Sequence, residues 1–268
     1  MSSVKFKSFS SGSCGNCYFL GIFGDDPHRC EAGVIIDAGV SPRRLKKELQ
    51  YEGLCFDDFS AVLVTHDHAD HIRSLGSFCK HISKPVWATE ELHRALSRHM
   101  MTRYQITDYR MELGEGRWNE IVPGRIRARY FVVPHDASQT VGYAILLDDY
   151  KFVIMTDIGA MTEEAMNWAR QADTVVIESN YDPEMLRLGP YPPDLQARIR
   201  GGHGHLSNPE CAEAIRAFNH DGLKHIFLCH LSEHNNTPEL AYECSLPWKG
   251  EASLAPLPRQ TASKLFVL

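Results

Sequence analysis

The sequence predicts an α/β protein formed as one domain over residues 1–268, and three observations lead to that prediction. Segments with the apolar pattern of strands alternate with amphipathic segments along the chain. Ala61–Thr65 is an uninterrupted apolar and β-branched run, typical of a parallel strand buried on both faces. No disordered linker divides the chain, although residues 182–202, rich in proline and glycine, are expected to form an irregular arm or a substrate-lining insert.

The expected elements follow one another with short connections. Strands are predicted at residues 4–9, 18–23, 33–37, 61–65, 85–88, 126–133, 142–147, 151–155, 174–178, 225–229 and 264–268. Helices are predicted at residues 42–51, 72–81, 90–101, 163–172, 209–218 and 238–244. In the first helix Leu45 and Leu49 form the inward face, and Ser207 or Asn208 is expected to cap the fifth. Asp148-Asp149-Tyr150 is expected to turn a hairpin.

The strongest signal for chemistry comes directly after the buried strand at residues 61–65. There the chain reads His66-Asp-His68-Ala-Asp70-His71. Polar residues on a loop would be the plain explanation, but three imidazoles and a carboxylate within six positions are the usual ligand set of zinc and similar ions. At a spacing of two, His66 and His68 can face one ion, and Asp70 with His71 can face a neighbouring ion.

Three later residues also stand just beyond predicted strands. His135 follows residues 126–133 and supplies the third nitrogen that His66 and His68 lack for a tetrahedral site. Asp157 follows residues 151–155 and is either a carboxylate that bridges two metals or a turn residue. His230 follows residues 225–229, and His234 is an alternative to it. Because the ends of neighbouring parallel strands meet at one edge of a sheet, these residues are expected to share one site.

Two further features near the amino terminus are open to more than one interpretation. Asp37, at the end of a predicted strand, either caps the next helix or orients a ligand histidine. The turn Ser10–Cys17 holds Gly12 and Gly15, which permit tight folding and let amides and hydroxyls face a phosphate. Cys14 and Cys17 form a lone C-x-x-C, for which a tight turn is favoured over a redox or zinc role because no second pair exists.

Composition narrows the class of protein. A net charge of −6 does not favour general affinity for nucleic acid, but between Arg94 and Arg129 eight arginines oppose four acids. That segment is either a phosphate-facing patch or a solvated helix face. Eight cysteines without paired spacings, no signal pattern and no long apolar run predict a cytoplasmic protein with reduced thiols and no membrane contact.

The order Asp37, His66 to His71, His135, Asp157 and His230 resembles the metallo-β-lactamase fold superfamily over most of the chain. The resemblance implies a four-layer αββα sandwich of two mixed β-sheets. Within the superfamily the chain looks like the bacterial YycJ/WalJ (VicX) group of nucleases. The segments that carry this likeness are Ser10–Asn16, Glu178–Asn180, Gly204–Asn208 and His230–Asn236. The group usually has serine where this chain has Cys14 and Cys17.

The resemblance implies two divalent metal ions per chain, with zinc, manganese and iron all compatible with the ligands. One ion would take His66, His68 and His135, the other Asp70, His71 and His230, with Asp157 between them. Asp70 would also steer the attacking water.

A histidine before the last ligand assists catalysis in the similar RNase Z branch, and His205 matches that role. It would protonate the leaving alkoxide or hold the phosphate, and Glu178 would fix its ring. Ser13 and Asn16 are expected to contact substrate.

The leading functional hypothesis is a dinuclear metal-dependent phosphodiesterase that acts on nucleic acid, DNA more than RNA, as an exonuclease with 5′ to 3′ polarity by family resemblance. One alternative is a metal-dependent hydrolase of small thioesters or lactones, similar to glyoxalase II. This alternative gives His205 no evident role. Another is a metal-bearing regulatory protein without turnover, although no candidate ligand is missing. No protein partner can be inferred from the sequence.

Overall fold

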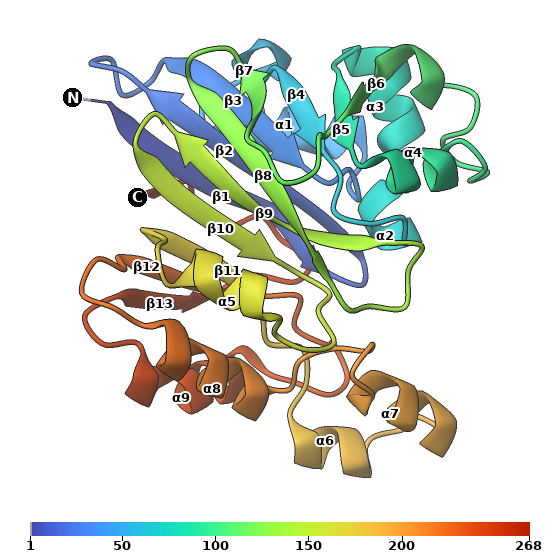
Figure 1. Ribbon diagram of the computed structural model, residues 1–268, viewed down its shortest axis with the longest axis vertical. Coiled ribbons are helices and arrows are strands. Elements are labelled where there is room, and N and C mark those ends of the chain that lie inside the picture. The colour runs from blue at the N-terminus through green and yellow to red at the C-terminus, as the bar shows by residue number, and fades with distance from the viewer. Residues whose placement is uncertain (1) are drawn as a thin grey trace.

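The computed structural model describes residues 2–268 and consists of two seven-stranded sheets packed face to face (Figure 1). The first sheet has the order β14 (Phe266–Val267), β1 (Ser3–Gly12), β2 (Gly15–Phe23), β3 (Cys30–Ile36), β4 (Ala61–Leu63), β5 (Val86–Ala88) and β6 (Arg110–Glu112). The second has the order β13 (Ser253–Pro256), β12 (His225–Cys229), β11 (Thr174–Glu178), β10 (Tyr150–Met155), β9 (Thr140–Leu147), β8 (Ile126–Val133) and β7 (Asn119–Val122).

Both sheets are mixed. In the first, β14 to β3 pair antiparallel, whereas β3 to β6 pair parallel. In the second, β13 to β10 are parallel and β10 to β7 antiparallel, including the predicted hairpin of β9 and β10. Parallel strands are buried on both faces, which explains the continuous apolar runs of β4, β11 and β12.

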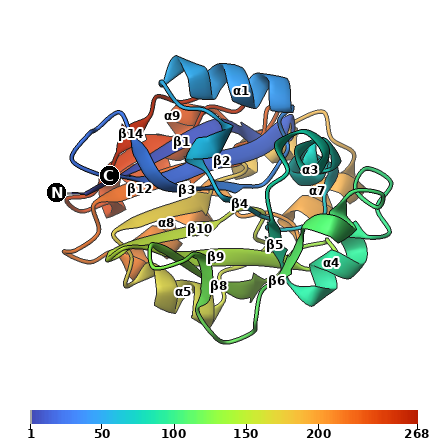
Figure 2. The same cartoon turned by 90° about the horizontal axis from the view of Figure 1, so that it is seen from above.

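Helices cover the outer face of each sheet (Figure 2). The first sheet is covered by α1 (Pro42–Tyr51), α3 (Leu75–Ile82) and α4 (Glu90–Leu96), with α2 (Ala69–Ile72) at its end. The second is covered by α5 (Glu163–Ala169), α8 (Asn208–Phe218) and α9 (Pro238–Ser245), and α6 (Pro183–Leu188) and α7 (Pro193–Arg200) project from its end. The predicted αββα sandwich is confirmed.

Aromatic side chains join the two sheets. Phe6 of β1 lies with its ring centroid 5.3 Å from that of Phe152 and 5.0 Å from that of Phe227, which belong to the opposite sheet. All three rings are almost completely buried. Large buried aromatic rings contribute both apolar area and specific ring contacts to stability. This packing fixes the two sheets against each other, so that the strand ends at one edge keep a constant separation.

The structure corrects several predicted elements. Residues 72–81 do not form one helix: the N–H of Ser74 donates to Ala38 O at 3.0 Å, and the chain turns between α2 and α3. The segment 182–202 is not irregular, because α6 and α7 begin at Pro183 and Pro193, a position where proline needs no hydrogen-bond partner. The helix expected to reach residue 101 ends at Leu96. Three short strands, β6, β7 and β13, were not predicted.

Other predictions hold closely. Helix α1 has the predicted limits, and Leu45 and Leu49 are buried. Helix α8 is capped by Ser207, whose hydroxyl accepts from the Glu210 N–H while the Glu210 carboxylate accepts from the Ser207 N–H. Among the helices of residues 2–268, none combines the length and apolar character that crossing a bilayer requires.

Candidate metal centre and active site

The predicted ligands meet at one edge of the sandwich. Strands β4, β8, β10 and β12 all end there, and each is followed within a few residues by a candidate ligand. His66, His68 and His135 form the first group: one ring nitrogen from each lies within 4.8 Å of the other two. His66 and His135 are buried, whereas the His68 side chain is 32% exposed and faces solvent. This group is therefore accessible from one side.

Asp70, His71 and His230 form the second group, again with ligand atoms within 4.8 Å of one another. The Asp70 Oδ2 atom lies 3.6 Å from Nε2 of His71 and 3.6 Å from Nε2 of His230. Helix α2 carries Asp70 and His71, and its single turn brings both side chains back toward the strand ends. A short helix directly after β4 thus separates the second group from the first.

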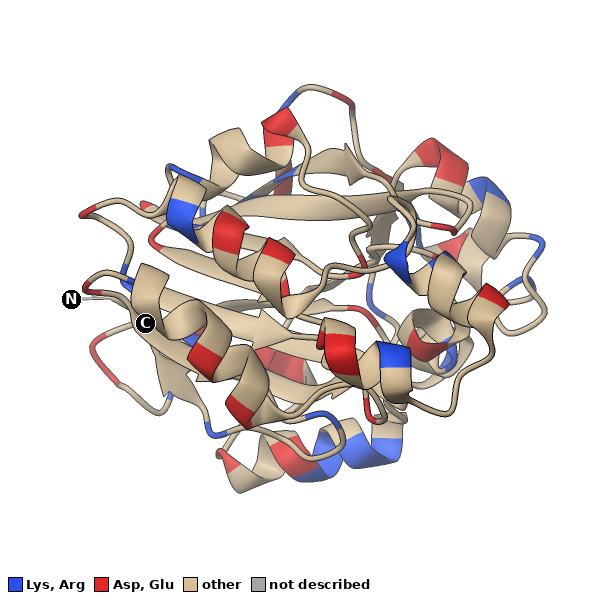
Figure 3. Cartoon of the chain, turned by 90° about the horizontal axis from the view of Figure 1, so that it is seen from below, with Lys and Arg blue, Asp and Glu red and all other residues tan. Residues whose placement is uncertain are grey.

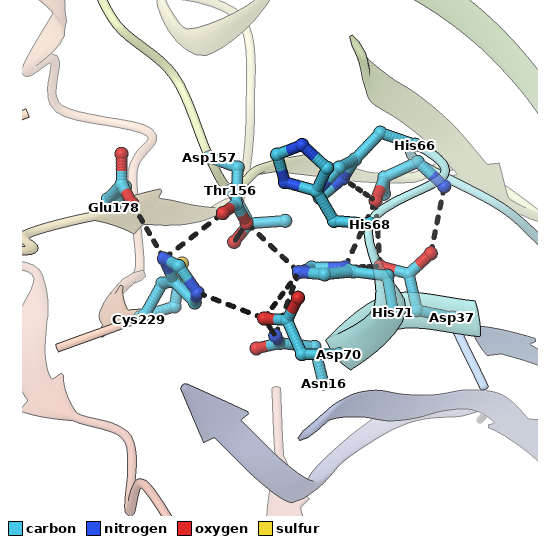
Figure 4. Close-up of polar contacts among 12 residues, drawn as sticks. Asn16, Asp37, His66, His68, Asp70, His71, Thr156, Asp157, Glu178 and Cys229 are labelled. Atoms are coloured by element: carbon cyan, nitrogen blue, oxygen red, sulfur yellow. Dashed lines mark hydrogen bonds and ion pairs between the residues drawn. The ribbon is translucent and has the colours of Figure 1, made fainter. Parts of the chain in front are cut away.

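Asp157 lies between the two groups (Figure 4). Its Oδ2 atom is 3.1 Å from His71 Nε2, and its Oδ1 atom is 3.8 Å from His135 Nε2 and 3.3 Å from His230 Nδ1. One carboxylate therefore faces histidines of both groups, which is the geometry that the bridging interpretation requires. Gly159 follows it closely: a Cβ on Gly159 would lie 2.3 Å from Gly202 O.

The backbone at the site is strained. Among residues 2–268, five residues other than glycine have positive φ, and three of them, Asp37 (60°), Asp157 (55°) and His230 (53°), belong to this edge. Left-handed backbone costs a non-glycine residue of the order of 1 kcal/mol or more, and it tends to be retained where function needs a particular side-chain direction. At each of the three the chain turns sharply after a strand, and the side chain points into the cluster.

Asp37 orients His71 rather than capping a helix. It is fully buried, and its Oδ2 lies 2.7 Å from His71 Nδ1. The same carboxylate accepts from the N–H and the hydroxyl of Thr65, each at 2.8 Å. The cap of α1 is Ser41. A carboxylate on one imidazole nitrogen fixes the ring and leaves the other nitrogen free to coordinate.

Glu178 joins two histidines. Its Oε1 atom lies 2.8 Å from Nδ1 of His205 and 2.8 Å from Nδ1 of His230. Its Oε2 atom accepts from the backbone N–H groups of Ile158 and Leu206 at 3.0 and 3.1 Å. With both oxygens occupied, this fully buried carboxylate cannot rotate, so the rings of His205 and His230 are held in a fixed relation, with centroids 5.3 Å apart.

Charges in the cluster shift its pKa values in opposite directions. Burial lowers the pKa of His66 and of His135, which therefore remain neutral. Burial also opposes protonation of His71, but the carboxylates of Asp157, Asp37 and Asp70 outweigh it and raise the pKa of His71 to about 10. The pKa of His230 is likewise raised, against burial, by Asp157, Asp70 and Glu178. Without a metal ion, His71 and His230 therefore hold protons, and a cation that binds at these histidines must displace them.

Three buried nitrogens give an independent indication that the cluster fits metal ions. The Nε2 atoms of His66, His135 and His230 are buried and have no hydrogen-bond partner among residues 2–268. Buried polar atoms without partners are rare and costly in folded proteins. Two of them belong to the first ligand group and one to the second. Coordination of a divalent ion is the simplest way to satisfy all three, and imidazole with carboxylate is a suitable donor set.

A cleft of about 330 Å³ opens over the cluster. His68, His205 and His230 lie in its wall, so both ligand groups are reached from it. The outer wall comes from α7 and the loop before it and includes Tyr191 and Arg198. A volume of this size suits one small ligand or one monomer of a polymer and is too small for a double helix.

Sequence reasoning missed residues of this outer wall. The guanidinium of Arg198 pairs closely with the carboxylate of Asp136, and Asp136 Oδ1 also lies 3.6 Å from His68 Nε2 and 3.5 Å from His135 Nε2. The ring of Tyr191 meets that of His234 edge-on, with centroids 6.0 Å apart. The position of Asp136 directly after His135 was a usable signal. Residues 182–202 were predicted to be an arm or a substrate-lining insert, but Tyr191 and Arg198 were not singled out within it.

One of the two expected substrate contacts lies differently from expectation. Asn16 is fully buried, and its amide donates to Asp70 Oδ2 at 3.0 Å, so it supports that ligand and does not face substrate. Ser13 is exposed and lines the cleft. His234 lines the cleft outside the ligand groups, which hold His230. Cys14 is exposed and Cys17 is buried, and both are free thiols.

The arginines at residues 94–129 do not line the cleft. Arg94 pairs with Glu90, Arg110 with Glu112, and Arg125 with acids on other elements. Paired arginines on a surface are largely neutralised. Four other arginines of the segment are exposed and have no acidic partner among residues 2–268: Arg98, Arg103, Arg117 and Arg127. The segment is thus a solvated surface outside the cleft that is only partly neutralised.

A family model described as a beta-lactamase superfamily domain matches residues 33–231, which hold every ligand of both groups. The chain belongs to the metallo-β-lactamase superfamily and is a metal-dependent hydrolase of that class. Within it, the exodeoxyribonuclease YycJ of Bacillus anthracis is 34% identical over 238 residues, 89% of this chain and 86% of that protein. The exodeoxyribonuclease WalJ of Streptococcus pneumoniae is 31% identical over 252 residues, 93% of this chain and 90% of that protein.

Solved structures support the fold. The metallo-β-lactamase fold protein YhfI of Bacillus subtilis superposes with a TM-score of 0.68 at 13% identity, covering 98% of this chain and 99% of that one. The short form of human tRNase Z superposes with a TM-score of 0.60 at 15% identity, covering 85% and 93%. At such low identity the likeness concerns the fold alone.

Proposed function

We propose that the protein is an exonuclease that hydrolyses phosphodiester bonds of nucleic acid, DNA in preference to RNA and with 5′ to 3′ polarity, using two divalent metal ions. The observation that carries the proposal is the pair of ligand groups that share Asp157 and open onto one cleft with His205 in its wall. The names of the YycJ and WalJ relatives support nucleic acid as the substrate.

The first ion would be held by His66, His68 and His135, and the second by Asp70, His71 and His230, with Asp157 common to both. Zinc is the first expectation for these ligands, and manganese and iron also suit them. Two such ions, when bound, activate water near neutral pH and offset negative charge on a phosphate undergoing in-line displacement.

The protein's own residues then have distinct tasks. Asp70 is partly exposed, and its second oxygen would orient the attacking water by accepting its hydrogen bond. His205, held by Glu178 at 2.8 Å, faces the cleft with 22% of its side chain exposed. Burial opposes protonation of His205, but Glu178 and Asp157 raise its pKa, so the ring carries the proton that the leaving alkoxide needs.

The size of the cleft supports action at a strand end. A cleft of about 330 Å³ accommodates roughly one nucleotide, with Tyr191 offered for stacking on a base and Arg198 close to the phosphate. Helix α7 and the loop before it form the outer wall of the cleft, and we infer that a double helix does not lie across the cluster. A frayed end can enter, whereas an internal phosphate of a duplex cannot.

The test is cleavage of end-labelled DNA and RNA by metal-loaded protein, with bis-p-nitrophenyl phosphate and a thioester as small substrates. We expect stepwise shortening of DNA from the 5′ end, with His68→Ala inactive on every substrate. A circular single strand, which has no end, should resist cleavage. Turnover of the thioester far above that of the phosphodiester would replace the proposal by the small-ester hydrolase. Retention of the wild-type phenotype by a metal-free variant would favour a regulatory role. A cytoplasmic location remains a prediction.

A further inference from the structure

Helix α1 is strongly basic within an acidic chain. Its ten residues hold four cations and one acid, a local excess of three positive charges, whereas the whole chain has a net charge of −6. The cations are Arg43, Arg44, Lys46 and Lys47, and the acid is Glu48. Figure 3 shows α1 at the lower edge of the view, with the colour of Lys and Arg along much of the helix.

The outer cations of α1 are not neutralised. Arg43, Lys46 and Lys47 are exposed, and within residues 2–268 none of the three forms an ion pair with an acidic side chain. This distinguishes them from Arg94 and Arg110, each of which has an acidic partner at 2.5 to 3.1 Å. An unpaired row of cations keeps its full field toward solvent and attracts polyanions.

The row begins at the rim of the cleft. A guanidinium nitrogen of Arg44 donates to Gln260 O at 2.6 Å, and the Gln260 amide donates to Glu233, a residue of the cleft wall, at 3.1 Å. Beside it, Arg73 donates at 3.4 Å to the carbonyl of Ser13, another residue of that wall. Arg44 of α1 is thus linked through Gln260 to Glu233 in the wall of the cleft, which places α1 near the entrance to the metal centre.

We propose that the outer face of α1, formed by Arg43, Lys46 and Lys47, binds the phosphate backbone of the duplex part of a DNA substrate whose end occupies the cleft. The inference rests on the proposed nuclease function. A ten-residue helix is about 15 Å long, and backbone phosphates recur every ~3.4 Å along each strand. Three cations on this face therefore reach several consecutive phosphates without reading sequence.

The distribution of apolar residues favours a polyanion over a membrane. Leu45 and Leu49 of α1 are buried against the first sheet, so the outer face offers charge without an apolar stripe. A helix that binds a bilayer surface inserts such a stripe between the lipid headgroups. Binding to DNA needs only the unpaired cations, since release of counterions from the phosphates drives it.

The test compares two triple variants of the metal-loaded protein. Arg43→Gln/Lys46→Gln/Lys47→Gln removes the α1 cations, and glutamine keeps a comparable helix propensity. The matched control, Arg98→Gln/Arg103→Gln/Arg117→Gln, removes three exposed cations on other elements that likewise have no acidic partner among residues 2–268 and do not line the cleft. Binding to a labelled duplex with a short single-stranded end and hydrolysis-resistant phosphorothioate links is measured by anisotropy at several salt concentrations. Thermal melting checks that both variants fold.

For the α1 variant we expect affinity to fall roughly tenfold or more, and the slope of log K against log salt to fall by ~2 to 3, about one per lost phosphate contact. The control should bind within about twofold of wild type, and both should hydrolyse bis-p-nitrophenyl phosphate normally. Equal affinities and slopes for the two variants would overturn the inference even if DNA cleavage is normal. So would a selective loss of binding to phosphatidylserine vesicles by the α1 variant. Failure of wild type to cleave any nucleic acid would instead overturn the proposed function.

Discussion

Replacement of Asp37 by asparagine tests how the protein prepares the second ligand group. The Asp37 carboxylate receives three contacts at 2.7 to 2.8 Å, from His71 Nδ1 and from the N–H and hydroxyl of Thr65. Asparagine has the same shape but only one oxygen, so its NH₂ group must face a donor. The variant therefore loses the group that holds His71 with its Nε2 directed at the metal position.

The expected effect of Asp37→Asn is a loss of metal affinity. Removing a partner of this kind weakens metal binding by roughly 10- to 100-fold, which is about 1.4 to 2.7 kcal/mol. The ion held by Asp70, His71 and His230 should bind more weakly. The affinity of the ion held by His66, His68 and His135 should stay nearly unchanged. Asp37 also helps to raise the pKa of His71 to about 10. In the variant, the metal ion therefore meets less competition from a proton on His71. The loss of metal affinity relative to wild type should thus be smaller at pH 6 and larger at pH 9.

Competition with a chromophoric chelator, followed at both pH values, measures the two zinc affinities. Asp67→Asn is the matched control, since Asp67 lies between His66 and His68 but accepts hydrogen bonds from Ser138, at 3.1 Å from its N–H and 2.6 Å from its hydroxyl. If Asp37→Asn bound both zinc ions as tightly as wild type does, the reasoning would be refuted. A loss of the same size in Asp67→Asn would also refute it.

Three further predictions follow from the same geometry. Gly159→Ala places a methyl group 2.3 Å from Gly202 O and should lower the free energy of unfolding by about 1 to 3 kcal/mol; an unchanged urea midpoint would contradict the close approach. His205→Ala should lower cleavage of nucleic acid by roughly 10² to 10⁴ while metal content stays at the wild-type value, and loss of metal would instead make His205 a ligand. Carboxylates hold a proton on His71 in the metal-free protein, and zinc must displace that proton. The affinity for zinc should therefore rise from pH 6 to pH 9, and calorimetry in different buffers should detect the released proton. A zinc affinity that does not change with pH would count against a protonated His71.

Local sequence predicted which candidate ligands lie at one edge of the sandwich, because each of them follows an apolar strand. In β4 the run from Ala61 leaves no doubt about where the strand ends, so His66 to His71 had to lie at the sheet edge. The same reasoning located His135 and His230. In the structure β10, β11 and β12 are parallel neighbours, and β8 runs in the same direction as β10 because β9 pairs antiparallel with both. The sandwich itself needed the resemblance, since alternation of helices and strands fits many α/β folds.

What local sequence could not provide depends on contacts between distant segments. Tyr191 and Arg198 reach the cleft only because α7 folds back beside the loop that follows β8. Asn16 looked exposed in a glycine-rich turn, but the approach of Asp70 at 3.0 Å buries it. The arginines at residues 94–129 were counted together although they lie on separate elements, and the acidic partners that some of them have became visible only in the structure. Short edge strands such as β6 carry too few residues to show a pattern.

The most direct test of the central claim is metal content per chain in wild type and Asp157→Asn, measured by elemental analysis beside cleavage of a 5′-labelled duplex. Asparagine tolerates the positive φ of 55° at this position and removes the charge that both ligand groups face. The shared-carboxylate account predicts two ions in wild type, fewer in the variant, and a ladder of products that requires both ions. One ion in wild type, or the same content and cleavage in both proteins, would contradict it.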